Sequence, residues 1–203
     1  TLRRYTNLAA TIHALKSRTI TLLNPSLWDD RNDAFFMSQY KERMSAKSVL
    51  ALCFAEASET YHHWRVFSHG SDGTCIEFDK DKLLATFIGN AKVKSGSVSY
   101  PTIIEMKGIT PHVAQLPFLK RYPYQDEKEF RIVYTDSDQV TEAKEFDIDL
   151  GAITKINLSP WLPLPLSKSV VSSLRAIDGC SRLKIYRSTL VENENWKTIG
   201  KRA

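Results

Sequence analysis

The chain of 203 residues has a mass of 23.1 kDa and is 42% hydrophobic, so a single domain over residues 1–203 can bury a sizeable core. With 25% charged and 10% aromatic residues, the composition argues against wholesale disorder. The net charge of +5 is mild and the basic residues are scattered, which permits a nucleotide or nucleic acid as partner without singling one out.

The expected cellular setting depends on features that the sequence lacks. No run approaches the roughly 18 apolar residues of a membrane-spanning helix, and the first five residues have no signal-peptide character. The cysteines, Cys53, Cys75 and Cys180, are widely spaced and odd in number, so they indicate neither a disulfide framework nor a zinc site. Cys53 and Cys75 lie in apolar runs and are expected in the core. We therefore expect a cytoplasmic protein without a membrane partner or a metal, and the oligomeric state stays open.

Short apolar runs alternate with helical patterns through the first half of the chain. Leu8, Ile12 and Leu15 recur at helical spacing, which predicts a short helix. Residues 49–54 are continuously apolar, as in a strand that is buried on both faces. The other elements expected here are strands at 2–5, 19–23 and 74–78, a helix that ends at Met44 and a helix at 61–67.

The second half continues the same alternation. Asp79 can cap a helix over residues 80–88, and residues 130–134 are a clear strand with which residues 145–150 are expected to pair. Residues 103–120 are ambiguous. The remaining expected elements are strands at 93–100, 153–158 and 183–186, a helix at 170–177 and a frayed C-terminal tail. The pattern favours an α+β domain with a mixed, mostly antiparallel core sheet, whole or split in two, flanked by four or five helices.

The first polar cluster occupies residues 28–33. Asp29, Asp30 and Asp33 could together hold a divalent cation, because hard cations prefer several oxygen ligands. They could equally cap the following helix, since Asp and Asn accept hydrogen bonds from the free backbone donors at a helix start. Capping is the simpler interpretation, and the metal site is the alternative.

The second cluster contains His62, His63 and His69 around an aromatic pair. Adjacent histidines on a helix point to different faces and the zinc-protease spacing is absent, so this cluster does not favour zinc. Trp64 and Phe67 lie three residues apart and are interpreted as a pair that faces either the core or a ligand. The glycine turn that follows at residues 70–73 lacks the spacing of a phosphate-binding loop.

A third cluster alternates along the expected late strand. Glu127, Glu129 and Arg131 would project from one face, opposite the apolar residues at 130, 132 and 134. The row is therefore interpreted as a solvated face, with a polar cleft as the alternative. In either case Arg131 would keep both carboxylates ionised.

The fourth cluster, Arg3-Arg4-Tyr5, lies on the first strand. An arginine there could bind phosphate through a two-pronged hydrogen bond, or form an ordinary basic edge.

Seven motifs, in this order, resemble those of one family. They are a Tyr on an opening strand, an Asn-Asp phrase, a Cys-Phe strand, an aromatic helix, a Gly-x-Cys-x-x-Phe strand, a Glu-x-Glu-x-Arg strand and a late Arg-Ser. In this chain they correspond to Tyr5, residues 28–33, Cys53-Phe54, Trp64 with Phe67, Gly73 with Cys75 and Phe78, residues 127–131, and Arg187-Ser188. Over nearly its whole length the chain thus resembles the bacterial and phage domain-of-unknown-function family 2971. It departs at residues 28–33, which lack the usual Pro and apolar residue, and at Phe67, where a Tyr is usual.

A second resemblance implies an activity. The layout of a cationic or aromatic residue on the first strand, an aromatic after a middle strand and a Glu on a late strand is similar to that of ADP-ribosyltransferases. This resemblance implies that Arg4 or Tyr5 holds NAD and that Trp64 stacks on nicotinamide. It also implies that Glu129 stabilises the oxocarbenium-like ribose and that Glu127 selects the acceptor. The full set of expected substrate-binding residues is Arg4, Tyr5, Asp30, Asp33, Trp64 and Arg131. The implied protein is an enzyme that uses NAD as substrate, in the setting of a toxin or a phage-defence effector.

Two other functions are kept open. The chain could be a non-catalytic module that binds a nucleotide or nucleic acid by base stacking on Tyr61, Trp64, Tyr122 and Tyr124. It could also be a metal-dependent nuclease or hydrolase that uses Asp30, Asp33 and Glu129.

Overall fold

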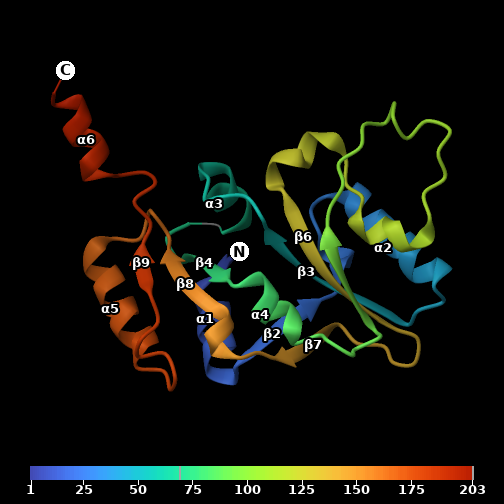
Figure 1. Ribbon diagram of the computed structural model, residues 1–203, viewed down its shortest axis with the longest axis horizontal. Helices are drawn as coiled ribbons and strands as arrows, with labels where there is room; N and C mark the ends of the chain where they lie inside the picture. Colours follow the sequence, from blue (N-terminus) through green and yellow to red (C-terminus); the bar gives the residue numbers. More distant parts are fainter. Residues whose placement is uncertain (69, 203) are drawn as a thin grey trace.

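One continuous β-sheet organises the chain (Figure 1). The computed structural model describes residues 1–68 and 70–202, and within them lie nine strands, six α-helices and four short 3₁₀ helices. The strands are β1 (Leu2–Asn7), β2 (Thr19–Leu23), β3 (Ser48–Ala55), β4 (Gly73–Phe78), β5 (Val93–Ser97), β6 (Glu129–Asp136), β7 (Ala143–Asp147), β8 (Ile153–Leu158) and β9 (Ile185–Arg187). The α-helices are α1 (Leu8–Ser17), α2 (Arg31–Arg43), α3 (Tyr61–Phe67), α4 (Lys80–Ala85), α5 (Leu164–Arg175) and α6 (Glu194–Gly200). The 3₁₀ helices are η1 (Pro25–Leu27), η2 (Val113–Phe118), η3 (Tyr122–Glu127) and η4 (Leu150–Ala152).

The sheet forks at β3. Its main path runs β5-β6-β3-β1-β4-β8-β9, and β2 with β7 forms a branch beside β3. All described pairs are antiparallel except β8 with β9, which confirms the mixed, mostly antiparallel α+β fold. β3 pairs with β6 over its whole length, but it pairs with β1 only at Arg3↔Ala55 and with β2 only at Leu23↔Ala51. The prediction that residues 145–150 pair with the strand at 130–134 is wrong, because β7 pairs with β2.

Hydrophobic residues bury both faces of β3 and β6, as the apolar run at 49–54 predicts. The larger cluster lies under α1, α4 and α5 and includes Leu50, Ile132 and Tyr134. The smaller cluster lies under α2 and η2 and includes Val49 and Val133. Side chains from consecutive residues of a strand point to opposite faces, so the alternation along β6 divides it between the two clusters. The face of the smaller cluster also carries the candidate functional site.

Several element boundaries differ from the expected ones for local reasons. α4 ends at Ala85 rather than residue 88, since the chain turns through Gly89, whose φ of +81° suits glycine. α5 begins at Leu164, six residues earlier than expected, with Pro165 in its first turn, where proline is well tolerated. The tail expected to fray contains α6, capped by Asn193.

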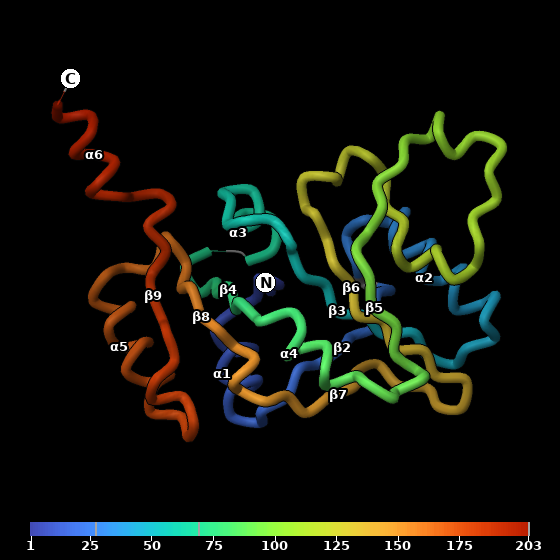
Figure 2. The backbone as a smooth tube through the Cα atoms, in the orientation of Figure 1, coloured from blue at the N-terminus to red at the C-terminus, as the bar shows by residue number. Residues whose placement is uncertain are grey.

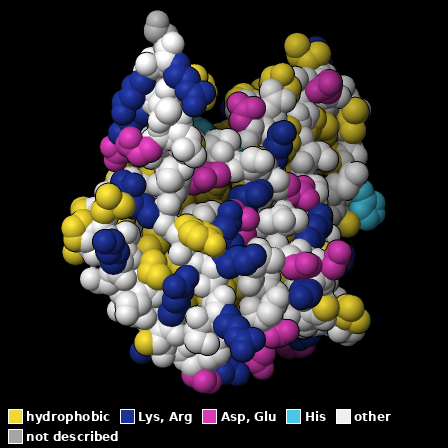
Figure 3. All heavy atoms as spheres, turned by 60° about the vertical axis from the view of Figure 1, so that its left-hand side comes forward, with side chains coloured by type: hydrophobic (Ala, Val, Ile, Leu, Met, Phe, Trp, Pro, Cys, Tyr) yellow, Lys and Arg dark blue, Asp and Glu magenta, His cyan; other side chains and the backbone are white. Residues whose placement is uncertain are grey.

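α6 stands away from the rest of the molecule and buries none of its described residues (Figure 1). The face seen in Figure 3 shows this end of the chain as a prong with Lys and Arg side chains, and elsewhere on that face both signs of charge are interspersed. This distribution agrees with the scattered basic residues of the sequence. None of the helices in the described ranges is long and apolar enough to cross a membrane.

Candidate functional site

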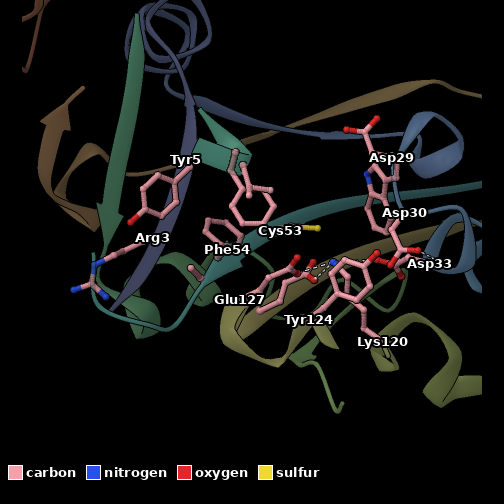
Figure 4. A pocket seen from close by; sticks show the side chains of 15 residues that line it. Arg3, Tyr5, Asp29, Asp30, Asp33, Cys53, Phe54, Lys120, Tyr124 and Glu127 are labelled. Carbon is pink, nitrogen blue, oxygen red and sulfur yellow. Dashed lines mark hydrogen bonds and ion pairs between the residues drawn. The ribbon is translucent and has the colours of Figure 1, made fainter. Parts of the chain in front are cut away.

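A cavity of about 420 Å³ lies where β1 and β3 diverge. Its walls come from β1, β3, β6, α2 and the segment before it, α3, η3 and the segment between η2 and η3. Figure 4 shows Arg3 and Tyr5 at one end, the three aspartates at 29, 30 and 33 at the other, and Glu127 between them. We call the end with Tyr5 the aromatic end and the end with the three aspartates the acidic end.

Arg131 forms the base of the acidic end and is fully buried. Its Nε and Nη2 donate to the two carboxylate oxygens of Glu129 at 2.7 and 2.8 Å. Its Nη1 and Nη2 donate to the two oxygens of Asp33 at 2.8 and 2.5 Å, and Nη1 also donates to the carbonyl of Pro117 at 2.9 Å. The interpretation of this row as a solvated face is wrong, because Arg131, Glu127 and Glu129 are all buried.

Lys120 is the second cation of the acidic end, and its side chain is 9% exposed. Its Nζ lies 2.6 Å from Glu127 Oε2, 3.5 Å from Glu129 Oε2 and 3.7 Å from Asp33 Oδ2. Burial alone would lower the pKa of Lys120, but the carboxylates of Glu129 and Glu127 outweigh it and raise that pKa. Lys120 thus stays protonated and offsets part of the negative charge. No sequence pattern indicates Lys120, because it ends the ambiguous stretch at residues 103–120.

The two glutamates of the row differ in their environment. Burial opposes ionisation of Glu129, but the guanidinium of Arg131 outweighs it and holds the pKa of that carboxyl below its ordinary value. Burial raises the pKa of the Glu127 carboxyl despite the nearby ammonium of Lys120. Both oxygens of Glu129 are occupied by Arg131, whereas in the described part of the chain Glu127 Oε1 accepts no hydrogen bond. Of the two glutamates, Glu127 is therefore the one with a carboxylate oxygen free to meet a ligand.

Glu127 reaches the cavity by a different route from the expected one. It ends η3, and Lys128 follows in the left-handed conformation with φ of +42°, so only Glu129 and Arg131 share the strand. Figure 2 traces the excursion of the backbone between β5 and β6. This segment contains η2 and η3, and its residues Lys120 and Glu127 line the cavity. The three residues of the row meet at one site even though they do not lie on one strand.

The aromatic end is not built by Trp64. That side chain is fully buried, donates from Nε1 to Glu59 at 2.6 Å, and meets the ring of Tyr5 edge-on at 5.3 Å. The expected stacking of Trp64 on nicotinamide or on a base is therefore wrong, because no face of its ring lines the cavity. Aromatic rings that do line the cavity belong to Tyr5, Trp28, Phe54, Phe67 and Tyr124. Tyr5, one of the expected binding residues, is among them.

On β1 the arginine in the cavity is Arg3. Arg4 follows it and therefore points to the other face, where burial lowers its pKa to about 10. The expectation that Arg4 holds a substrate in this cavity is thus not supported. Arg3 donates from Nη1 to the carbonyl of Ala57 at 2.7 Å, and its Nε lies 3.4 Å from Glu77. It lines the cavity at the same end as Tyr5.

Asp30 caps α2, as the simpler interpretation predicts. Its Oδ1 accepts hydrogen bonds from the backbone N–H groups of Asn32 and Asp33 at 3.0 and 3.4 Å. Its Oδ2 is buried at the cavity wall and has no hydrogen-bond partner among the described residues. Asp29, beside it, is exposed and also lines the cavity.

Metal-ligand chemistry has little geometric support. Within residues 1–68 and 70–202, no three His, Cys, Asp or Glu side chains are grouped to hold a metal ion. Of the three residues considered for a nuclease, Asp33 and Glu129 have their oxygens bound by Arg131. In the histidine cluster, His63 is buried and His62 is exposed, while His69 lies outside the described residues.

The cysteines divide between core and cavity. Cys75 is buried as expected, whereas Cys53 is half-buried and lines the cavity, so its expected core position is wrong. Burial raises the pKa of the Cys53 thiol, and the neighbouring Glu129 carboxylate adds to this effect. Cys53 is therefore a neutral thiol in the cavity wall and not a nucleophilic thiolate.

The lining as a whole is acidic. Five carboxylates (Asp29, Asp30, Asp33, Glu127 and Glu129) face the cavity among the described residues, against the cations Arg3 and Lys120, with Arg131 buried beneath. Such a site, with aromatic walls, suits a flat ligand that carries positive charge. The chain matches no family model, no curated protein and no solved structure.

Proposed function

We propose that the cavity binds NAD and that the protein is an ADP-ribosyltransferase-like enzyme. The observation that carries the proposal is the position of Glu127, whose free carboxylate oxygen lies between an aromatic end and an acidic end. The nicotinamide ring of NAD is flat and positively charged, so aromatic faces and an excess of carboxylates both favour it. Arg3, at the other end, can pair with the pyrophosphate.

The reaction breaks the bond between ribose C1′ and the ring nitrogen. Nicotinamide leaves as a neutral molecule with the bonding electron pair, and the ribose acquires oxocarbenium character. The Glu127 carboxylate stabilises this charge and then accepts the proton of the acceptor's hydroxyl or amine as that group bonds to C1′. Burial raises the pKa of Glu127, which suits it to take up that proton.

The two glutamates thus take different roles from those implied by the resemblance. Glu129 is held by both of its oxygens on Arg131, so it supports the site rather than meeting the ribose. Glu127, expected to select the acceptor, has the oxygen that is available. Asp33 shares the support role, since Arg131 binds both of its oxygens as well.

The other functions are less favoured by the same geometry. A nucleic acid is a polyanion, so the acidic lining of the cavity would repel it. Trp64 is fully buried, so a base cannot stack on its ring. A cytoplasmic setting as toxin or phage-defence effector, and membership of family 2971, remain part of the proposal. A reducing compartment would keep the three cysteines as the free thiols that the structure shows.

The proposal is tested by measuring the release of nicotinamide from NAD. Chromatography detects the released nicotinamide, and candidate protein and nucleic-acid acceptors are present in the reaction. We expect the wild-type protein to release nicotinamide and Glu127→Gln to be slower by about a hundredfold or more. Asp126→Asn, an exposed neighbour on η3, is the matched control and should retain the wild-type rate. Absence of release by the wild type, or an unchanged rate in Glu127→Gln, would contradict the proposal.

A further inference from the structure

His63 is a buried side chain of α3 whose two ring nitrogens are both engaged. Its Nε2 lies 3.1 Å from the carbonyl oxygen of Glu127, and its Nδ1 lies 2.5 Å from Thr60 Oγ1. A carbonyl oxygen can only accept a hydrogen bond, so Nε2 carries the proton. In the neutral ring Nδ1 then accepts from the hydroxyl of Thr60. These contacts fix both the tautomer and the orientation of the ring.

The same ring supports the aromatic end of the cavity. It stacks on Tyr5 with the centroids 5.4 Å apart and the planes at 20°, and it contacts Phe67 at 5.9 Å. Tyr5 and Phe67 both line the cavity, whereas His63 does not. One buried histidine therefore contacts two cavity rings and the backbone of the free glutamate.

The end of η3 needs such a partner. No N–H group of the helix donates to its last carbonyl oxygens, so these oxygens need donors from elsewhere in the protein. The last residue of η3 is Glu127, and Lys128 follows it in the left-handed conformation. The hydrogen bond from His63 satisfies the Glu127 carbonyl at the residue where the backbone changes direction.

We propose that His63 is a positioning residue, which holds Glu127 through its Nε2–H and holds Tyr5 through its ring. This inference rests on the proposed function, because it assigns a role in setting the geometry of that reaction. The hydrogen bond to Glu127 and the ring contact with Tyr5 should affect different kinetic constants. Loss of the Nε2 donor misplaces the acting carboxylate and lowers kcat, whereas loss of the ring loosens the binding wall and raises KM.

Two substitutions at the same position separate these effects. His63→Phe keeps a ring against Tyr5 but removes the donor, and His63→Gln keeps an N–H donor at a similar reach but removes the ring. For nicotinamide release from NAD we expect His63→Phe to lower kcat about tenfold to a hundredfold with little change in KM. We expect His63→Gln to keep kcat within a few-fold of the wild-type value and to raise KM. Equal losses in both variants would show a merely structural role and overturn the inference.

Matched controls and a spectroscopic arm complete the test. His62→Phe and His62→Gln make the same changes at the exposed neighbour and should leave kcat and KM unchanged. Histidine side-chain nitrogen NMR of the wild-type protein, with the His63 signals assigned, should show that ring neutral with its proton on Nε2. A proton on Nδ1 of His63 would overturn the inference even if neither variant folds. If the wild-type protein releases no nicotinamide but His63 shows the expected tautomer, the proposed function is overturned. The hydrogen bond from His63 to Glu127 is then still supported.

Discussion

Arg131 and Asp33 are 98 residues apart in the chain and are joined by two hydrogen bonds, of 2.8 and 2.5 Å, inside the molecule. Asp33 lies in the first turn of α2 and Arg131 lies on β6, so this pair ties the helix to the sheet beneath the cavity. Glu129 binds the same guanidinium from the strand itself. The acidic end of the cavity is therefore built on a buried network that must be complete to be stable.

Removal of Arg131 should destabilise the fold severely. Arg131→Ala removes the cation that binds both oxygens of Asp33 and of Glu129, and leaves these buried carboxylates only the more distant Lys120. Breaking a buried ion pair in this way costs about 3–5 kcal/mol. We expect a corresponding loss in the free energy of unfolding measured with urea. Arg121→Ala removes an exposed arginine nearby and should change stability by less than about 0.5 kcal/mol. Similar values for the two variants would contradict the structural role of Arg131.

The stabilising effect of Glu129 should depend on pH. Arg131 holds the pKa of this buried carboxyl below its ordinary value of 4.5, so the folded state favours the ionised form. The resulting stability is present above about pH 4.5 and is lost as the pH falls through the folded-state pKa. The difference in unfolding free energy between wild type and Glu129→Gln, measured by urea titration from about pH 7 to about pH 3, should therefore shrink on acidification. A difference that grows towards acid would mean that the carboxyl is not held ionised by Arg131.

Asp30 should behave as a helix cap. Asp30→Ala removes the acceptor of two backbone N–H groups and should cost about 1 kcal/mol of stability, whereas Asp30→Asn keeps an oxygen acceptor and should cost less. Asp29→Ala, at the exposed neighbour, is the control and should leave the unfolding free energy nearly unchanged. Thermal denaturation of the three variants measures this order. Equal stability in Asp30→Ala and Asp29→Ala would show that the cap contributes little.

Tryptophan fluorescence should distinguish the cavity from the core. Trp28 lines the cavity and lies over the guanidinium of Arg131 at 4.9 Å, whereas Trp64 is fully buried against Tyr5. Addition of NAD should quench the fluorescence of the wild-type protein through Trp28, and Trp28→Phe should abolish most of that change. Trp64→Phe should keep the change, provided that circular dichroism shows it to be folded. The opposite result would restore Trp64 as the stacking residue.

Local patterns predicted most of the elements of the fold. The strand at 19–23 and the helix at 61–67 agree with β2 and α3 at both ends, because alternation and helical spacing are properties of neighbouring residues. The partner of β7 could not be predicted in this way, since strand pairing depends on the path of the whole chain.

Some residues of the site were predictable, but their environment was not. Glu127, Glu129 and Arg131 stood out by spacing, yet the same alternation suits a solvated face. Their burial follows from Asp33 and Lys120, which reach the site from separate parts of the chain. Likewise the spacing of Trp64 and Phe67 indicates a shared side of a helix, but not that Phe67 lines the cavity while Trp64 is enclosed.

The central claim is that an acidic cavity with aromatic walls binds a positively charged ring, and calorimetric titration with NAD and with NADH tests it most directly. The two ligands share every phosphate and ribose group, but the dihydronicotinamide ring of NADH is neutral. We predict that NAD binds with a Kd lower by about tenfold or more, because a desolvated cation over aromatic rings gains about 2 kcal/mol. Equal affinities, tighter binding of NADH, or no heat with either ligand would contradict the account.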